Sequence, residues 1–86
     1  MSKKSFPMKD KLLKDLIENH VNYNITSYWD VNQDGIIELD GDYYIQYSHD
    51  YLLFCEYPFL ISFQLDAINF SSDYPNFLQT ILDKVA

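Results

Sequence analysis

Two Asp-Gly dipeptides constrain the fold of this chain more than any other feature. Asp34-Gly35 and Asp40-Gly41 are separated by only four residues. Asp-Gly favours a two-residue turn between antiparallel strands, because both residues tolerate the positive φ that a type I′ turn requires. His49-Asp50 and Tyr57-Pro58 are weaker turn signals. Turns at these four sites predict an antiparallel meander of about four to five strands in the middle of the chain.

The predicted turns also assign each strand residue to a face, since residues opposite each other in an antiparallel pair point to the same side of the sheet. The stretch FLISFQL, residues 59–65, shows the period-two alternation that this assignment requires. One predicted face is almost entirely apolar. It collects Trp29, Val31, Ile36, Tyr43, Ile45, Tyr47, Leu52, Phe54, Phe59, Ile61, Phe63 and Leu65, with Glu38 and Glu56 as charged exceptions near turns. We expect Phe54, Ile61 and Phe63 to be buried under helices.

The opposite predicted face mixes apolar, polar and acidic side chains. It collects Tyr28, Asp30, Asn32, Ile37, Leu39, Asp42, Tyr44, Gln46, Tyr51, Leu53, Cys55, Leu60, Ser62, Gln64 and Asp66. An exposed face with this much apolar area usually marks an interaction surface. Two alternatives remain open, namely a helix that crosses over to cover this face and a homodimer that buries it.

Helical periodicity appears at both ends of the chain. Met8, Leu12 and Leu16 predict a helix from Pro7 to His20. A second apolar stripe predicts a C-terminal helix, with Ser72 as its N-cap and Pro75 in its first turn. Each helix has one apolar face, so both are expected to pack on the apolar face of the sheet. The chain, residues 1–86, is therefore predicted to be a single α+β domain with a helix, a meander and a second helix.

The charge is distributed unevenly along the chain. The formal net charge is −7, with 13 acidic and 6 basic residues. Five of the six lysines lie in the first fourteen residues, and from Asp15 to Asp83 there is no Lys or Arg. Direct binding to nucleic acid is not expected, because phosphate contacts require basic side chains. The pattern favours a basic protein as partner, although a role in solubility alone is the alternative.

The acidic stretch DVNQDGIIELDGD, residues 30–42, resembles two calcium-binding loops. Its D-x-N-x-D-G opening resembles the EF-hand loop, but Gly41 stands at the twelfth position, where that family has a bidentate Glu. It also resembles the calcium loops of integrin-type (FG-GAP) β-propeller repeats. These resemblances imply Ca²⁺ ligands at Asp30, Asn32, Asp34, Glu38 and the carbonyl of Ile36. A tight hairpin at Asp34-Gly35 would extend these residues along a strand, and this reading is preferred, so no metal is expected.

The candidate binding residues are the acidic side chains predicted to cluster at one end of the sheet. They are Asp30, Asp34, Asp40 and Asp42, with Tyr44 beside them. Carboxylates on a sheet can take the place of phosphates on the surface of a nuclease or another nucleic-acid-binding protein. In this general character the chain resembles phage-encoded inhibitors and the immunity proteins that neutralise nuclease toxins.

Catalysis, a membrane span and export are not expected. Cys55 lies in the middle of a predicted strand, so it is better explained as a structural residue than as a nucleophile served by His20 or His49. The chain has no apolar run of the length that spans a bilayer. It shows no signal peptide and has a lone cysteine, so we expect a cytoplasmic protein.

Overall fold

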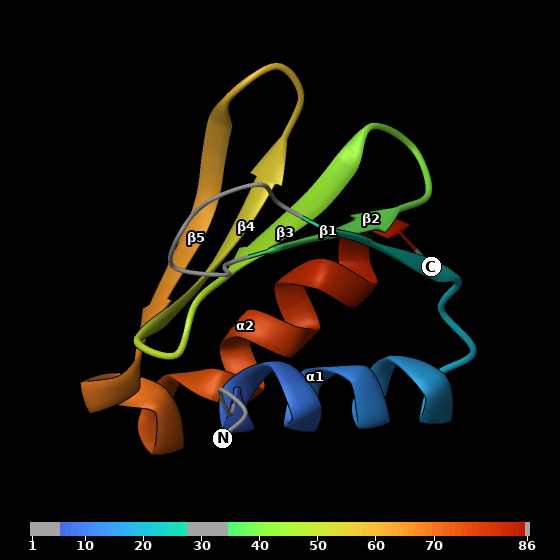
Figure 1. Ribbon diagram of the computed structural model, residues 1–86. Coiled ribbons are helices and arrows are strands. Elements are labelled where there is room, and N and C mark those ends of the chain that lie inside the picture. The colour runs from blue at the N-terminus through green and yellow to red at the C-terminus, as the bar shows by residue number, and fades with distance from the viewer. Residues whose placement is uncertain (1–5, 28–34, 86) are drawn as a thin grey trace, which may run out of the picture.

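The computed structural model describes residues 6–27 and 35–85 of the chain (Figure 1). The elements in chain order are α1 (Pro7–Glu18), β1 (Tyr23–Ser27), β2 (Gly35–Leu39), β3 (Tyr43–Tyr47), β4 (Tyr51–Glu56), β5 (Leu60–Asp66), the 3₁₀ turn η1 (Ala67–Asn69) and α2 (Phe70–Val85). The strands form one five-stranded antiparallel sheet in the order β1-β2-β3-β4-β5. The predicted α+β arrangement of helix, meander and helix is confirmed.

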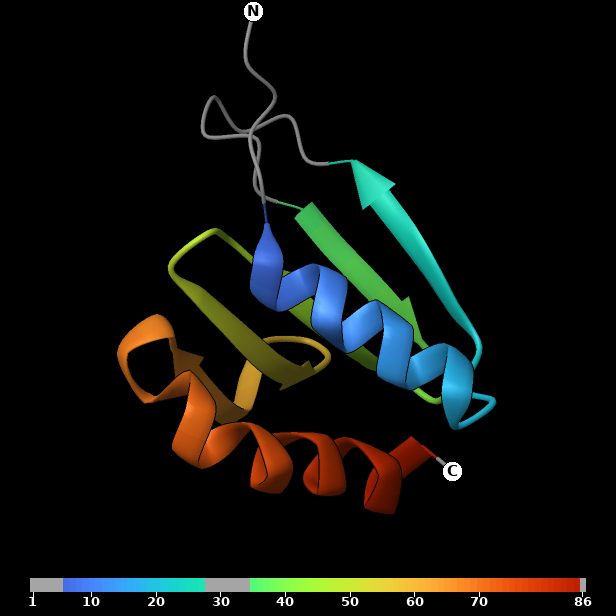
Figure 2. The ribbon, with the colours of Figure 1, turned by 90° about the horizontal axis from the view of Figure 1, so that it is seen from below.

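Both helices lie on the same side of the sheet, which we call the inner face (Figures 1 and 2). The side chains that α1 buries there recur every four residues, at Met8, Leu12 and Leu16. The core also contains Ile37, Leu39, Ile45, Tyr47, Leu52, Phe54 and Leu65 from the sheet, and Tyr74, Phe77 and Ile81 from α2. No helix of the described residues covers the opposite side, the outer face. Burial of one apolar stripe is what stabilises helices of this length.

The register of β2 differs from the predicted one. Residues 40–42 form a three-residue loop instead of a two-residue turn, so Glu38 pairs with Tyr44. A shift of one residue turns every side chain of a strand to the other face. Ile37 and Leu39 therefore lie in the core, although they were predicted on the outer face. Glu38 lies on the outer face, where it is exposed. This register buries two aliphatic side chains and leaves a carboxylate in water, which makes it the more stable one.

The first strand, β1, lies earlier in the chain than predicted. β1 ends at Ser27, which pairs with Gly35, the first residue of β2. The predicted two-residue turn at Asp34-Gly35 is therefore wrong. The ring of Tyr47 on β3 occupies the space that a Cβ on Gly35 would need, so glycine here permits close packing rather than a turn. Trp29 and Val31, predicted in the first strand, lie outside the described residues.

Ile61 does not lie on the buried face of the β4–β5 hairpin, where it was predicted. The connection is a three-residue turn at 57–59 that contains a cis X-Pro peptide. Phe54 pairs with Phe63 whereas Cys55 pairs with Ile61, so a β-bulge separates the two pairs. Phe54 is fully buried and Phe63 packs against the core, as predicted. Ile61 is exposed opposite Cys55, because the bulge redirects the strand beyond it.

The helices differ from the prediction at their ends. α1 ends at Glu18 rather than at His20. α2 begins at Phe70, so Ser72 and Pro75 lie inside the helix. Ser72 does not cap it, and its hydroxyl donates a hydrogen bond of 3.2 Å to a carbonyl of η1. Among the described residues, no helix is both long and apolar enough to cross a membrane.

A buried polar contact joins the two helices. The hydroxyl of Tyr74 on α2 donates to the carboxylate of Asp15 on α1 at 2.5 Å. Lys11 forms an ion pair with the same carboxylate at 3.3 Å, and its Nζ lies 5.6 Å from the centre of the Tyr74 ring. Burial and the Asp15 carboxylate both raise the pKa of Tyr74. The two buried polar side chains of this contact, Asp15 and Tyr74, therefore each have a partner, as a low-dielectric interior requires.

Candidate protein-binding surface

The β2–β3 loop carries two of the predicted binding residues, Asp40 and Asp42. Gly41 and Asp42 have positive φ angles of 73° and 65°. Glycine adopts this left-handed region freely, and Asp is among the residues that tolerate it best. Two consecutive left-handed residues reverse the chain within three positions and leave both carboxylates exposed. The sequence Asp-Gly-Asp thus places two negative charges at one end of the sheet.

The turn of the β4–β5 hairpin lies at the same end of the sheet as this loop (Figure 1), and Tyr57 joins the two. Its backbone N–H donates to the carbonyl of Asp42 at 2.9 Å, and its hydroxyl donates to Glu38 at 3.4 Å. Thr26 on β1 donates to the other oxygen of Glu38 at 3.3 Å. Glu56 ends β4 directly before the turn. We call Glu38, Asp40, Asp42 and Glu56 the acidic corner.

The negative charge of the acidic corner has no cationic partner within the described residues. The ion pairs of the described residues join Lys9 to Asp10 and Lys11 to Asp15, and His49 Nε2 lies 3.0 Å from the carboxylate of Asp50. The lysines in the described part of the chain all belong to the two helices, namely Lys9, Lys11, Lys14 and Lys84. Clustered charges of one sign create a field that attracts cationic partners and weakens as salt screens it.

Tyr44, the fifth predicted binding residue, is placed differently from the aspartates. Its side chain lies on the outer face but is only 5% exposed. The ring of Tyr57 lies over it, with the ring centroids 4.5 Å apart, and the Tyr44 hydroxyl donates to the carbonyl of Pro58 at 3.5 Å. A partner at this position would meet Tyr57 first. Tyr44 therefore supports the hairpin turn through its contacts with Tyr57 and Pro58.

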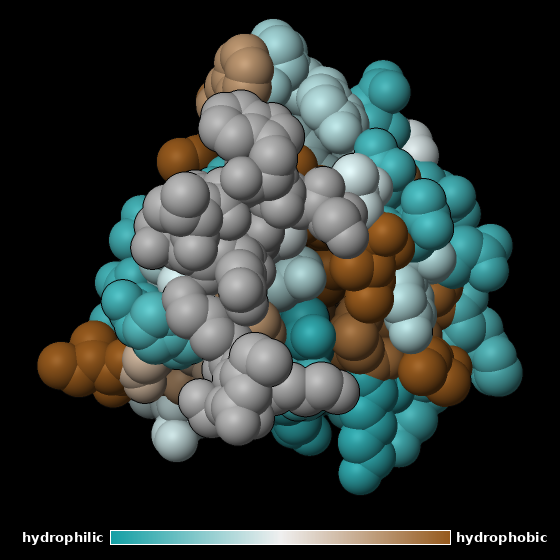
Figure 3. Space-filling model, viewed as in Figure 1, coloured by the Kyte–Doolittle hydropathy of each residue, from teal (hydrophilic) through white to brown (hydrophobic). Residues whose placement is uncertain are grey.

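Sequence reasoning missed an apolar surface that adjoins the acidic corner. Phe59, Leu60 and Ile61 are 86%, 62% and 53% exposed, and we call them the apolar ridge. Leu60 pairs with Glu56 across the hairpin, so the ridge and the acidic corner share a border. In Figure 3, apolar atoms gather at the projecting end of this hairpin, beside hydrophilic atoms over the β2–β3 loop. The available signal was three consecutive apolar residues directly after Pro58, but alternation alone assigned two of them to the core.

The structure describes only some of the remaining sequence-predicted residues. Asp30, Asn32 and Asp34 lie outside the described residues, so their roles in partner or Ca²⁺ binding stay predictions. Of the other two implied Ca²⁺ ligands, Ile36 lies within β2, and the carboxylate of Glu38 accepts the hydrogen bonds from Thr26 and Tyr57. The described residues contain no cluster of three His, Cys, Asp or Glu side chains that could hold a metal ion.

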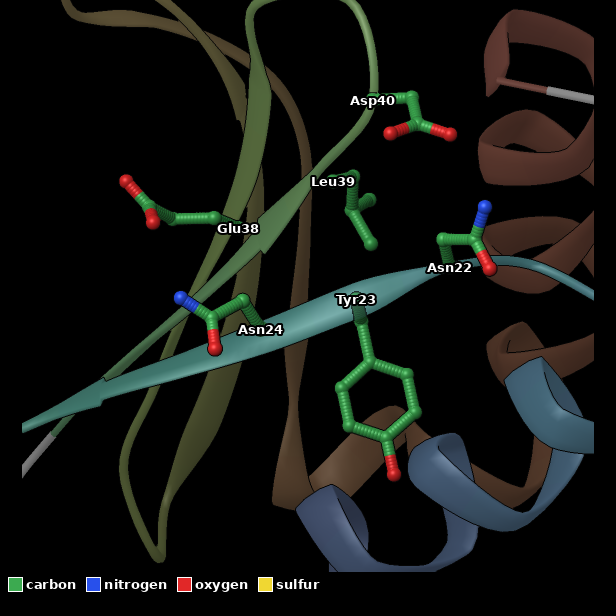
Figure 4. A pocket seen from close by; sticks show the side chains of 6 residues that line it. All are labelled: Asn22, Tyr23, Asn24, Glu38, Leu39 and Asp40. Atoms are coloured by element: carbon green, nitrogen blue, oxygen red, sulfur yellow. The ribbon is translucent and has the colours of Figure 1, made fainter.

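A shallow hollow of about 220 Å³ lies between the ends of β1 and β2, and the residues that line it are Asn22, Tyr23, Asn24, Glu38, Leu39 and Asp40. Its volume is below the range of about 300–1,000 Å³ that is typical of small-molecule sites. Its polar groups also diverge: Glu38 points to one side of the strands, whereas the ring of Tyr23 points toward α1 (Figure 4). The hollow therefore lacks the convergent polar groups of a catalytic pocket, and it borders the acidic corner through Glu38 and Asp40.

Cys55 has the environment of a structural residue. It is buried beside Tyr44, and its thiol donates to the carbonyl of Leu53 at 3.8 Å. Burial raises the pKa of Cys55, and a hydrogen bond with Tyr44 offsets part of this effect. A raised pKa keeps the thiol protonated at neutral pH, whereas a nucleophile needs the thiolate. His49 lies in the turn before β4, where it pairs with Asp50.

The described part of the site thus combines an acidic corner, an apolar ridge and a tyrosine pair that connects them. Two of the residues proposed from the sequence, Asp40 and Asp42, lie in the acidic corner, and the structure adds Tyr57 and the apolar ridge as candidates. No protein-family model, curated protein or solved structure matches this chain.

Proposed function

We propose that this protein is a small acidic binding domain that occupies a basic surface of a partner protein, in the manner of an inhibitor or an immunity protein. The observation that carries the proposal is the acidic corner. It holds four carboxylates around two adjacent turns, while the described lysines all lie on the two helices. The role is proposed to be binding rather than catalysis.

The chemistry of the acidic corner favours a partner that handles nucleic acid. Surfaces that bind nucleic acid present clustered Lys and Arg for phosphate contacts. Carboxylates at the end of a rigid sheet offer the same charge in a fixed arrangement, and the hydrogen bonds that Glu38 accepts from Thr26 and Tyr57 hold it in place. Asp30 and Asp34 are proposed to contribute further negative charge to the binding surface.

A homodimer through this end of the molecule is the competing proposal, and charge argues against it. Two copies that met through the acidic corner would bring like charges together, which is unfavourable without a bridging cation. A basic partner would instead neutralise these charges, and its association would be accelerated by electrostatic attraction.

The experiment compares two variants that remove the same amount of charge. Asp40→Asn/Asp42→Asn removes two of the four charges of the acidic corner, and asparagine tolerates the positive φ at position 42. Asp50→Asn/Asp83→Asn removes two charges from the β3–β4 turn and from α2. The immobilised wild-type protein and both variants are incubated with an extract of the source cells, at low and at high ionic strength, and the retained proteins are quantified.

We expect the wild type to retain a basic protein at low ionic strength and to release it at high ionic strength. The corner variant should retain several-fold less of that protein, and the variant with Asp50 and Asp83 changed should match the wild type. Capture that is independent of salt, or equal loss in both variants, would contradict the proposal. Asp30→Asn/Asp34→Asn tests the two remaining aspartates in the same assay.

A further inference from the structure

The apolar ridge differs from ordinary exposed apolar residues because its members lie together at one hairpin end, with Leu60 and Ile61 on opposite faces of it. Phe59, Leu60 and Ile61 follow one another in the chain, and the half-exposed Tyr57 lies on the same turn. Isolated exposed apolar side chains are common on protein surfaces, whereas several at one projecting point often mark an interaction site. Ile68 on η1 is an isolated case in this molecule and is 90% exposed.

The shape of the hairpin places the ridge beyond the reach of the helices. Below the bulge, Phe63 packs edge-on against Phe77 of α2, with the ring centroids 5.4 Å apart. At the bulge the pairing changes from Phe54 with Phe63 to Cys55 with Ile61, so the turn end of the hairpin leaves the helix-covered layer. Figure 1 shows this end projecting away from both helices. A β-bulge that redirects side chains next to a turn is a recurrent device of functional sites.

The surroundings of the ridge define the chemistry of what it can bind. Leu60 pairs with Glu56, and the Tyr57 hydroxyl donates to the carboxylate of Glu38, so acidic residues border the apolar surface. The Tyr57 backbone N–H also donates to the main-chain carbonyl of Asp42, which holds the β2–β3 loop beside the turn. An interface built in this way has an apolar centre and a charged rim. Its complement is an apolar pocket bordered by Lys or Arg. A second copy of this chain would place carboxylates at that border instead.

We infer that the apolar ridge inserts into an apolar pocket on a basic partner protein, and that Phe59 and Leu60 are its anchors. This inference rests on the proposed function, since the pocket belongs to the same partner as the basic surface that meets the acidic corner. The two parts act on different rate constants. The acidic corner accelerates association, whereas buried apolar anchors slow dissociation.

The test begins with a photoreactive group on the ridge. p-Benzoylphenylalanine replaces Phe59 in one form of the full chain and Ile68 in the other, and both are irradiated in an extract of the source cells. The protein that crosslinks at position 59 and not at position 68 is identified, produced in pure form and used as the probe in surface-binding kinetics. The binding variants are Phe59→Ser/Leu60→Ser, Asp40→Asn/Asp42→Asn and the control Ile68→Ser, each first checked for an unchanged thermal melt.

We expect the ridge variant to dissociate about 10- to 100-fold faster with little change in association rate and in salt dependence. The corner variant should associate more slowly and lose salt dependence, and the Ile68 variant should behave as the wild type. Unchanged dissociation in the ridge variant, no crosslink specific to position 59, or a crosslink only to a second copy of this chain would each overturn the inference. If the corner variant still loses salt-dependent binding in those cases, the proposed function stands without the ridge. If only the ridge variant is impaired, the ridge is an anchor and the electrostatic function fails.

Discussion

The β4–β5 hairpin has two ends of similar composition, and only one of them is buried. At the end near the β3–β4 turn, Leu52 pairs with Leu65 and Phe54 pairs with Phe63, and these residues pack in the core with the two helices. At the other end, residues 59–61 are just as apolar but lie exposed beside the acidic corner. The bulge after Phe54 marks the boundary between the two ends.

This difference shows that apolar character in a strand does not by itself make a residue part of the core. Burial requires a neighbouring element that covers the residue's face, as the helices do at one end of this hairpin and the ring of Tyr57 does over Tyr44. The covered end stabilises the fold by removing apolar surface from water, whereas the exposed end contributes little of this free energy. Its residues can therefore change without loss of the fold, which is the property that a binding surface needs.

The largest expected effect tests this contrast with the same substitution in α2, which packs on the covered end, and at the exposed end of the hairpin. Phe77→Ala should lower the free energy of unfolding by about 3–5 kcal/mol, because Phe77 is fully buried against Phe63 and truncation leaves a cavity. Phe59→Ala should change it by less than about 0.5 kcal/mol. Urea unfolding measures both. A cost at Phe59 comparable to that at Phe77 would show that the ridge belongs to the core.

The second largest effect is expected at the contact between the two helices, which joins Tyr74 of α2 to Asp15 of α1. Tyr74→Phe removes the hydroxyl that donates to Asp15 and leaves a buried carboxylate with one fewer partner. We expect a loss of about 1–3 kcal/mol in the free energy of unfolding. Tyr23→Phe is the matched control, because the Tyr23 hydroxyl makes no hydrogen bond within the described residues, and it should be nearly neutral. Equal effects of the two changes would mean that the Asp15 contact does not stabilise the fold.

The same contact predicts a dependence of stability on alkaline pH. The folded state raises the pKa of Tyr74, so folding favours the protonated phenol. Its contribution is complete below the unfolded pKa of about 10 and is lost as pH rises beyond that value toward the folded pKa. There the wild type should lose up to about 1.4 kcal/mol more per pH unit than Tyr74→Phe. Parallel stability curves for the two proteins above pH 10, measured by urea unfolding, would contradict the raised pKa.

A smaller effect is expected in the loop beside the exposed end. Gly41→Ala places a Cβ on a residue with φ of 73° and should cost about 1 kcal/mol. Gly41→Asn should cost less, because asparagine tolerates the left-handed region. Thermal melts compare the two variants. Equal melting temperatures for both would indicate that the three-residue loop does not require this conformation.

Calcium is expected to have the smallest effect, with no change at either end of the hairpin. A ligand that binds only the folded state must raise the melting temperature of the protein. Because no Ca²⁺ binding is expected, thermal melts in chelator and in millimolar Ca²⁺ should superimpose. A rise in Ca²⁺ that disappears in Asp30→Ala would establish the calcium-loop reading instead.

The candidate site was predictable from the sequence only in part. The exposure of Asp40 and Asp42 followed from an Asp-Gly-Asp loop between apolar segments. The burial of Tyr44 and the exposure of Ile61 did not follow, because each depends on the length of the hairpin turn at 57–59 and on the bulge. Two-residue and three-residue turns have similar local sequence preferences, so the sequence could not distinguish them.

The sequence by itself determined the type and order of the elements and the one-sided charge between Asp15 and Asp83. Helical and strand periodicities are local properties, and charge needs no fold. Only the tertiary structure decided the register of β2, the bulge in the β4–β5 hairpin and therefore which apolar residues the helices cover. The physical reason is that side chains alternate between faces with a period of two, so one residue more or less in a turn reverses a whole strand. The burial of Ile37 and Leu39 against the helices favours the three-residue loop at 40–42. The packing of Phe63 against α2 likewise favours the register of the β4–β5 hairpin.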